Sequence, residues 1–208
     1  MSTYSELVAR IRDDLDRGTN YDDDIRDAIY GAVQFLEHNN FGFNIRIANF
    51  ETTSRYTTLS ADIISITRLR IYDGGNLYVV QPENYLTLDE IDTRPTDGSR
   101  PTRWAMEARL LRLYPAPDQT YSFDANVVYR VAGIESPSAS DDVSNAWTNE
   151  ARELVRFQAA VDVLETKIKG PDAVQDAMVL RQRLSQVLHQ LQARAGRDQK
   201  TGGITPWL

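Results

Sequence analysis

The chain changes its hydrophobic pattern twice, and this feature constrains the possible folds more than any other. Apolar residues recur at helical spacing toward both ends of the 208-residue sequence, whereas the middle is rich in β-branched and aromatic residues. Each helical end holds two helix-length segments separated by a glycine. The pattern therefore predicts two helices, a run of strands and two more helices, in that order.

Residues 1–40 are predicted to form an N-terminal helical hairpin. The segment from Thr3 to Glu6 matches a capping box, in which a hydroxyl and a carboxylate bond to free amides at a helix start. Gly18 interrupts the pattern, and Asp22-Asp23-Asp24 opens the next helix, where carboxylates favour the positive end of the helix dipole. The apolar face of this second helix is expected to be buried and consists of Ile25, Ala28, Ile29, Ala32, Val33 and Leu36.

Residues 41–144 are predicted to form an inserted antiparallel β module. The sequence Asp73-Gly74-Gly75-Asn76 is a hairpin turn signal between two strands. A short helix is expected between residues 82 and 93, followed by single strands at 104–114 and 121–131.

Residues 145–195 are predicted to form a second helical hairpin, because their apolar residues form two seams with spacings of three and four. Gly196 is expected to end the regular structure and to leave a flexible C-terminal tail at 196–208. The predicted fold class is α+β: a four-helix bundle of two helical hairpins, with an inserted antiparallel β module and an extended C-terminal tail. The seams are Leu154, Phe157, Val161, Leu164 and Ile168, then Ala173, Ala177, Leu180, Leu184, Val187 and Leu191.

Residue types argue against an enzyme. The chain has no cysteine and two histidines, and it carries no nucleophile, phosphate-loop or metalloprotease motif. The aspartates at 22–24 and 27 could bind a metal, but their spacing matches no calcium loop, and helix capping explains them better. Asp141-Asp142 would need a second carboxylate in a cleft to take part in acid–base chemistry, and the sequence indicates no such residue. No catalytic residue, metal site or cofactor is predicted.

Charge argues against stable binding of nucleic acid. The net charge is −7, and residues 1–40 carry 4 basic and 9 acidic groups, whereas phosphate binding needs clustered Lys and Arg. No stretch approaches the ~20 apolar residues of a membrane span. Seven tyrosines of the β segment could stack on single-stranded bases, but the acidic balance favours packing across strands, with some at a protein interface. They are Tyr56, Tyr72, Tyr78, Tyr85, Tyr114, Tyr121 and Tyr129.

The C-terminal tail is the one segment whose residues suggest a binding role. A polar stretch with two glycines ends in Ile204, Pro206, Trp207 and Leu208, and large apolar groups are costly to leave in water. Tryptophan is also a frequent anchor of protein interfaces. The tail is expected either to dock on a partner through these residues, to fold back on its own domain or to stay disordered.

The order of motifs resembles the head-to-tail adaptor, or head completion, proteins of tailed bacteriophages. Residues 64–74 contain the pattern I-x-R-L-x-x-x-D-G, and residues 109–118 contain L-x-L-x-P-x-P before a tyrosine-containing strand at 123–131. Asp141-Asp142 then precedes Trp147-Thr148-Asn149-Glu150, which opens a long helix.

This resemblance spans about residues 4–195 and implies a structural virion protein, not an enzyme. Such adaptors form a ring, usually of twelve copies, beneath the portal protein, with the helical bundle as its body and C-terminal segments on the portal. The other side of the ring receives a tail, nozzle or stopper protein, and DNA only passes through the channel. The implied location is the neck of the virion, after assembly in the host cytoplasm, with no membrane and no cofactor.

Three other interpretations stay open. The chain could be another tail-completion or neck protein, which would bind further from the portal. It could be an enzyme whose site carries no known motif, and a tightly bound metal or nucleotide would indicate this. It could also be a DNA-binding regulator, although the charge of residues 1–40 opposes a positive recognition surface.

Overall fold

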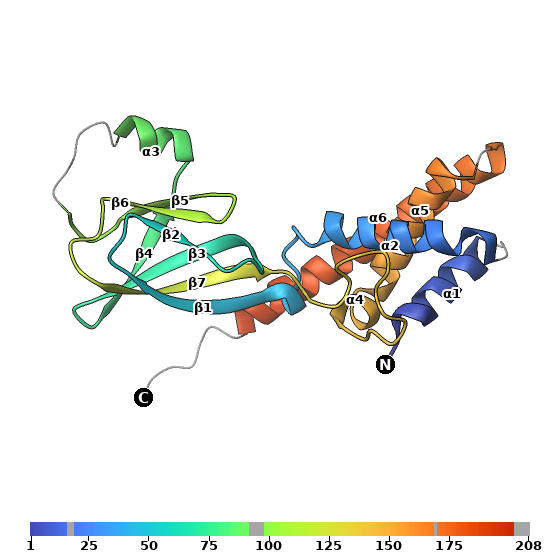
Figure 1. The fold of residues 1–208 in the computed structure, drawn as a ribbon, viewed down its shortest axis with the longest axis horizontal. Coiled ribbons are helices and arrows are strands. Elements are labelled where there is room, and N and C mark those ends of the chain that lie inside the picture. The colour runs from blue at the N-terminus through green and yellow to red at the C-terminus, as the bar shows by residue number, and fades with distance from the viewer. Residues whose placement is uncertain (16–18, 92–97, 169, 202–208) are drawn as a thin grey trace. The chain divides into compact units, whose positions relative to one another are not determined.

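The protein consists of two compact units, a helical unit and a sheet unit (Figure 1). The helical unit comprises residues 1–44 and 131–208, and the sheet unit comprises residues 45–130. The chain therefore crosses between the units twice. The computed structural model describes residues 1–15, 19–91, 98–168 and 170–201.

Five α-helices and two short 3₁₀ helices make up the described part of the helical unit. The capping box predicted for the first helix is confirmed, because the Thr3 hydroxyl accepts from the Glu6 amide and the Glu6 carboxylate accepts from the Thr3 amide. The bounds are α1 (Tyr4–Asp14), η1 (Thr19–Tyr21), α2 (Asp22–Leu36), η2 (Gly42–Asn44), α4 (Ala146–Asn149), α5 (Arg152–Thr166) and α6 (Pro171–Thr201).

The central helix of this unit is α5, which packs against α1, α2, α4 and α6. It buries residues on more than one face, and Ala159 and Ala160 among them let neighbouring helices approach closely. The apolar face predicted for α2 is confirmed, since all six of its residues are buried. The buried residues of α5 are Leu154, Val155, Phe157, Ala159, Ala160, Val161, Val163 and Leu164.

Asn44 closes the turn through which the chain leaves the helical unit. Its side chain is fully buried and accepts a hydrogen bond from the Phe41 amide at 2.9 Å. The same side chain donates to the carbonyl oxygens of Glu37 and Asn39, at 3.2 and 2.9 Å. These bonds fix the turn that follows α2.

The sheet unit contains a seven-stranded curled sheet in the order β1-β7-β3-β4-β5-β6-β2. All paired neighbours are antiparallel except β4 and β5, which are parallel. The sheet curls so that β5 comes against β3 (Figure 1). The strands are β1 (Ile45–Thr52), β2 (Tyr56–Thr58), β3 (Ile63–Asp73), β4 (Asn76–Pro82), β5 (Arg103–Glu107), β6 (Leu110–Tyr114) and β7 (Tyr121–Tyr129), with the helix α3 (Tyr85–Ile91) between β4 and β5.

The predicted hairpin between the third and fourth strands is confirmed. Gly74 and Gly75 have φ values of 56° and 82°, which glycine adopts without steric cost and which this tight turn requires. The inner face of the sheet forms a hydrophobic core separate from that of the helical unit, and its large members include Leu69, Ile71 and Phe123. The short helix expected between residues 82 and 93 is also found, as α3.

The predicted fold class is wrong. The sequence predicts a four-helix bundle with an inserted β module, but the protein is mixed α/β, with six α-helices in its described part and a seven-stranded sheet. The four long helices contribute to one hydrophobic core, but unequally: α5 is surrounded, whereas α6 fully buries mainly Ala173, Ala177 and Ala195 and leaves much of its length exposed. The β segment is large enough to form its own core.

Three local boundaries also differ from the sequence prediction. The strand predicted at 104–114 is two strands, β5 and β6, because the chain reverses at Ala108, whose φ is 51°. The helix α6 continues through Gly196 to Thr201. The chain rejoins the helical unit at Val131, because the stretch that follows bonds to the start of α1, with the Tyr4 amide donating to the Val143 carbonyl at 2.9 Å.

Candidate functional site: exposed interaction surfaces

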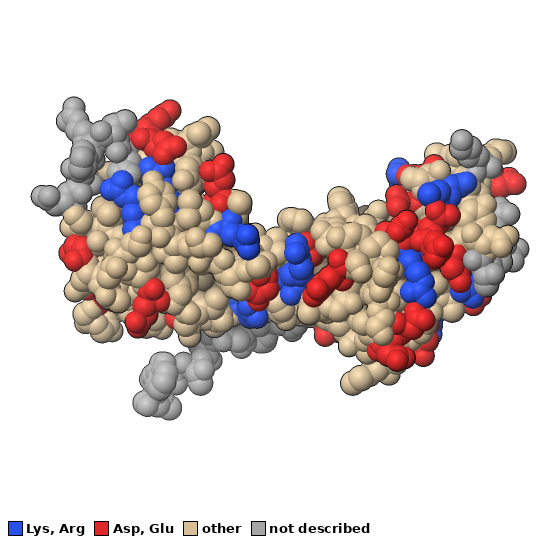
Figure 2. Space-filling view, viewed as in Figure 1, with Lys and Arg blue, Asp and Glu red and all other residues tan. Residues whose placement is uncertain are grey.

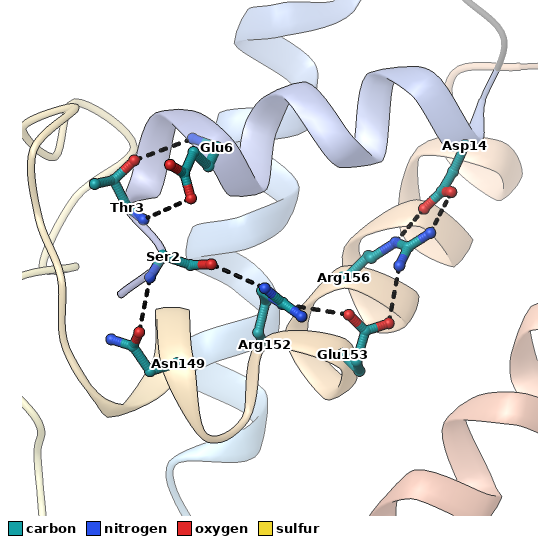
Figure 3. A network of polar contacts seen from close by, with 8 residues as sticks. All are labelled: Ser2, Thr3, Glu6, Asp14, Asn149, Arg152, Glu153 and Arg156. Carbon is teal, nitrogen blue, oxygen red and sulfur yellow. Dashed lines mark hydrogen bonds and ion pairs between the residues drawn. The ribbon is translucent and has the colours of Figure 1, made fainter.

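A polar network holds the N-terminus of the chain against α4 and α5 in the helical unit (Figure 3). The Ser2 amide donates to the side chain of Asn149 at 2.8 Å, and Arg152 donates to the Ser2 hydroxyl at 2.9 Å. Arg152 also contacts Glu153 at 3.3 Å. The network therefore joins the first residues of the chain to residues almost 150 positions later.

The same network continues along α5 to the end of α1. Arg156 donates to Glu153 at 2.9 Å and forms two hydrogen bonds with the carboxylate of Asp14. The hydrogen bonds with Asp14 raise the pKa of Arg156. Because both side chains of this pair are about a fifth exposed, the pair is partly protected from solvent and salt.

Acidic side chains gather on the helical unit (Figure 2). This unit contains 13 basic and 19 acidic residues, whereas the sheet unit contains 10 and 11. The aspartates at the start of α2 serve partly in ion pairs, since Asp22 pairs with Arg12 at 2.5 Å and Asp24 with Lys167 at 2.6 Å. Within the described residues, no three His, Cys, Asp or Glu side chains come together as metal ligands.

The outer face of the sheet carries an apolar surface at the β3–β4 hairpin. Tyr72 and Leu77 are cross-strand partners, and Val79 lies opposite Arg70, so these four side chains share one face. Tyr72, Leu77 and Val79 are each 44–45% exposed, and we call them the hairpin surface. No helix in the described part of the sheet unit covers this face, since α3 packs against β5.

Polar contacts fix the aromatic member of the hairpin surface. The Tyr72 hydroxyl donates to the Asp124 carboxylate at 2.8 Å, and this hydrogen bond raises the pKa of Tyr72. Arg70 lies 3.5 Å from the same carboxylate. The Tyr72 ring is therefore held in place with one side open to solvent. Because its conformation is already fixed, the side chain would lose little entropy on entering an interface.

The helical unit carries a second set of exposed apolar side chains. On α6, Val174, Met178 and Val179 are 57%, 66% and 46% exposed. On α2, Phe35 is 67% exposed. Single exposed apolar residues are common, but Val174 and Met178 are four residues apart, so they lie side by side on one side of the helix.

The residues predicted from sequence fall in different places. Ile204, Pro206, Trp207 and Leu208 lie outside the described residues. Among the tyrosines, Tyr121 is buried, Tyr85, Tyr114 and Tyr129 are half-buried, and Tyr56, Tyr72 and Tyr78 are exposed. The sequence prediction missed Phe35, Val174 and Met178. They could have been found as apolar residues that lie off the predicted seams.

Comparison with models of protein families shows to which family this chain belongs. The family model described as SU10 adaptor protein matches residues 2–206. The chain belongs to the SU10 adaptor protein family. The resemblance to head-to-tail adaptors of tailed bacteriophages is thereby confirmed.

Membership of the SU10 adaptor family makes this chain a structural virion protein that interacts with other head and tail proteins of a phage. Comparison with curated proteins finds no match. None of the helices in the described ranges is both long and apolar enough to cross a membrane.

We expect Asp14→Asn to destabilise the helical unit, because it removes the charge that Arg156 contacts through two hydrogen bonds. The expected loss in the free energy of unfolding is about 1–2 kcal/mol. Urea unfolding followed by circular dichroism would measure it. Asp13→Asn, the same change one residue earlier on the exposed side, is the control, and equal losses for both variants would contradict the role of the pair.

Proposed function

We propose that this SU10 adaptor forms a ring on the portal protein and joins the portal to the tail or neck. Family membership carries this proposal, and the exposed apolar surfaces support it. A closed ring needs heterologous contacts, in which one face of a copy binds a different face of the next. Apolar surfaces on two separately cored units supply several chemically distinct faces.

The charge distribution supports a passive role toward DNA. The helical unit has six more acidic than basic residues, and many copies of such a unit around a channel repel the duplex from the wall. A wall that does not hold phosphates lets DNA slide during ejection. The proposed ring has twelve copies and forms the neck of the virion.

Imaging by negative stain tests the portal contact. The purified chain is mixed with the portal ring of the same phage, and we expect a new symmetric layer on the outer end of the portal. Counting the subunits of this layer gives the copy number. Bare portals, in preparations whose components are both competent for assembly, would show instead that the chain is a neck or tail-completion protein that binds further from the portal.

The C-terminal residues Ile204, Pro206, Trp207 and Leu208 are proposed to dock on the portal. Because α6 continues to Thr201, the truncation that spares this helix begins at residue 202. Removal of residues 202–208 is expected to weaken portal binding by about 30-fold, the loss of one aromatic anchor, with no change in the melting temperature. If the truncated chain binds the portal as strongly as the full chain, the tail does not contribute to portal binding.

The hairpin surface is proposed to contact the tail-side component. The double variant Leu77→Gln and Val79→Thr should reduce binding of that component about tenfold while it leaves portal binding and folding intact, because both side chains are exposed. Leu86→Gln on α3, a residue that is 70% exposed in the same unit, is the control. A double variant that still recruits the tail component at full strength would exclude this surface.

A further inference from the structure

The exposed side of α2 carries a regular row of residues that nothing in the described chain covers. Asp23, Asp27, Gly31 and Phe35 are all exposed and follow one another at intervals of four residues, so they lie along one side of the helix. The row is acidic toward the helix start and apolar toward its end. We call it the α2 row.

No contact within the described chain requires a glycine at position 31, in the interior of α2. Glycine destabilises a helix interior relative to alanine, and it is used where a backbone must approach closely. A Cβ atom built at Gly31 meets nothing within 4 Å. The space that this glycine leaves is therefore open on the outside of α2, where another helix can approach.

The exposed flank of α6 carries a second row, formed by Val174, Met178, Arg181 and Ser185. Their spacings of four, three and four residues place them along one side of the helix. Val174, Met178 and Arg181 also line a groove of about 410 Å³, whose floor includes Leu164. This α6 row is apolar toward the helix start and basic further along.

We propose that the α2 row of one copy packs antiparallel on the α6 row of the next copy. In this arrangement Phe35 lies on Val174 beside the groove, and Met178 fills the space over Gly31. Asp27 then lies beside Arg181. The proposal rests on the ring assembly proposed above and names the surfaces that form the contact between its subunits.

The two rows match in length and charge only in the antiparallel direction. Phe35 and Asp27 are eight residues apart, and Val174 and Arg181 are seven, which corresponds to about 12 and 10 Å along a helix. A parallel arrangement would place the aspartates on the apolar end of α6 and Phe35 beside Arg181. Charge complementarity therefore selects both the partner and the direction.

Arg181 remains able to contact a second carboxylate. It donates to Glu165 at 2.7 Å through one nitrogen, and its side chain is 61% exposed. A guanidinium has five N–H donors, so several remain for an approaching aspartate. Asp27 is exposed at the surface of α2 and forms no ion pair among the described residues.

Because the rows lie on two different helices, they can form a heterologous contact, which is the arrangement we propose. Each copy uses its α2 row toward one neighbour and its α6 row toward the other, which is the requirement for a closed ring. The contact involves the helical unit alone and leaves the hairpin surface free for the tail-side component.

Disulfide cross-linking tests the register directly, because the chain contains no cysteine of its own. A full-length chain with Gly31→Cys and Met178→Cys is oxidised, both alone at high concentration and on the portal. We expect a ladder of linked oligomers on a non-reducing gel that collapses on reduction, whereas each single-cysteine variant gives at most dimers.

The register control pairs Gly31→Cys with Ser185→Cys. The latter position is seven residues, or about 10 Å, from Met178 along the helix, which is beyond disulfide reach of Gly31 in the proposed register. No ladder for the Gly31–Met178 pair in either condition, or an equal ladder for the control pair, would overturn the proposal.

Two further variants separate the contact from folding. Gly31→Gln is expected to leave the melting temperature unchanged or raised, since the site is open and glycine is lost from a helix, yet to weaken subunit association at least tenfold. Asp27→Arg should weaken association similarly, and Arg181→Asp in the same chain should restore most of it. Full association of Gly31→Gln, or no rescue by the second charge reversal, would contradict the contact.

The outcomes distinguish this inference from the proposed function. If wild-type rings form on the portal while the Gly31–Met178 pair gives no ladder, the surfaces are wrong and the adaptor role stands. If the ladder forms in the free chain while portals stay bare, the subunit contact stands and the portal-binding role is lost.

Discussion

The helical unit depends on the burial of α5 from several sides at once. Its small residues, Ala159 and Ala160, let neighbours approach, and its larger ones fill the space between them. The polar network from Ser2 to Arg156 then fixes α1 along this helix (Figure 3). Once α1 and α2 are held, the exposed side of α2 is presented as a rigid surface, which an interface between copies requires.

The sheet unit achieves its stability independently, through a hydrophobic core that shares no residue with the helical one. Its inner face is buried by the curl of the sheet, whereas the outer face at the β3–β4 hairpin stays open. Two separate cores let one chain carry two unrelated binding surfaces, because substitution on one unit leaves packing in the other unchanged. This division suits a protein that has to bind partners of different kinds.

The sequence predicted local structure well and the assembly of that structure poorly. The capping box at Thr3, the apolar face of α2 and the Gly74-Gly75 turn were readable because each depends on a few neighbouring residues. The reversal at Ala108 was not, since alanine gives no turn signal. The bundle prediction failed because periodicity shows which face of a helix is apolar but not how many helices that face meets.

Some residues of the candidate surfaces could likewise be predicted from local sequence, and others could not. Phe35 and Met178 could have been identified as apolar residues off the predicted seams, because helical spacing alone places them on the outside. The exposure of Leu77 and Val79 could not, since it depends on which strands flank β4 and on what covers the sheet. The tail residues that drew attention in the sequence, such as Trp207, lie outside the described residues.

The double crossing of the chain between its units has a mechanical consequence. β1 begins at Ile45 and pairs with Val128 near the end of β7, so both connections leave the sheet at the same end of one ladder. On the helical side, Asn44 anchors one of them through three hydrogen bonds. Tension between the units is thus shared by two chain connections that are pulled in the same direction. Such tension does not separate β1 from β7 one hydrogen bond at a time. Such a joint resists separation of the two units better than a single linker would.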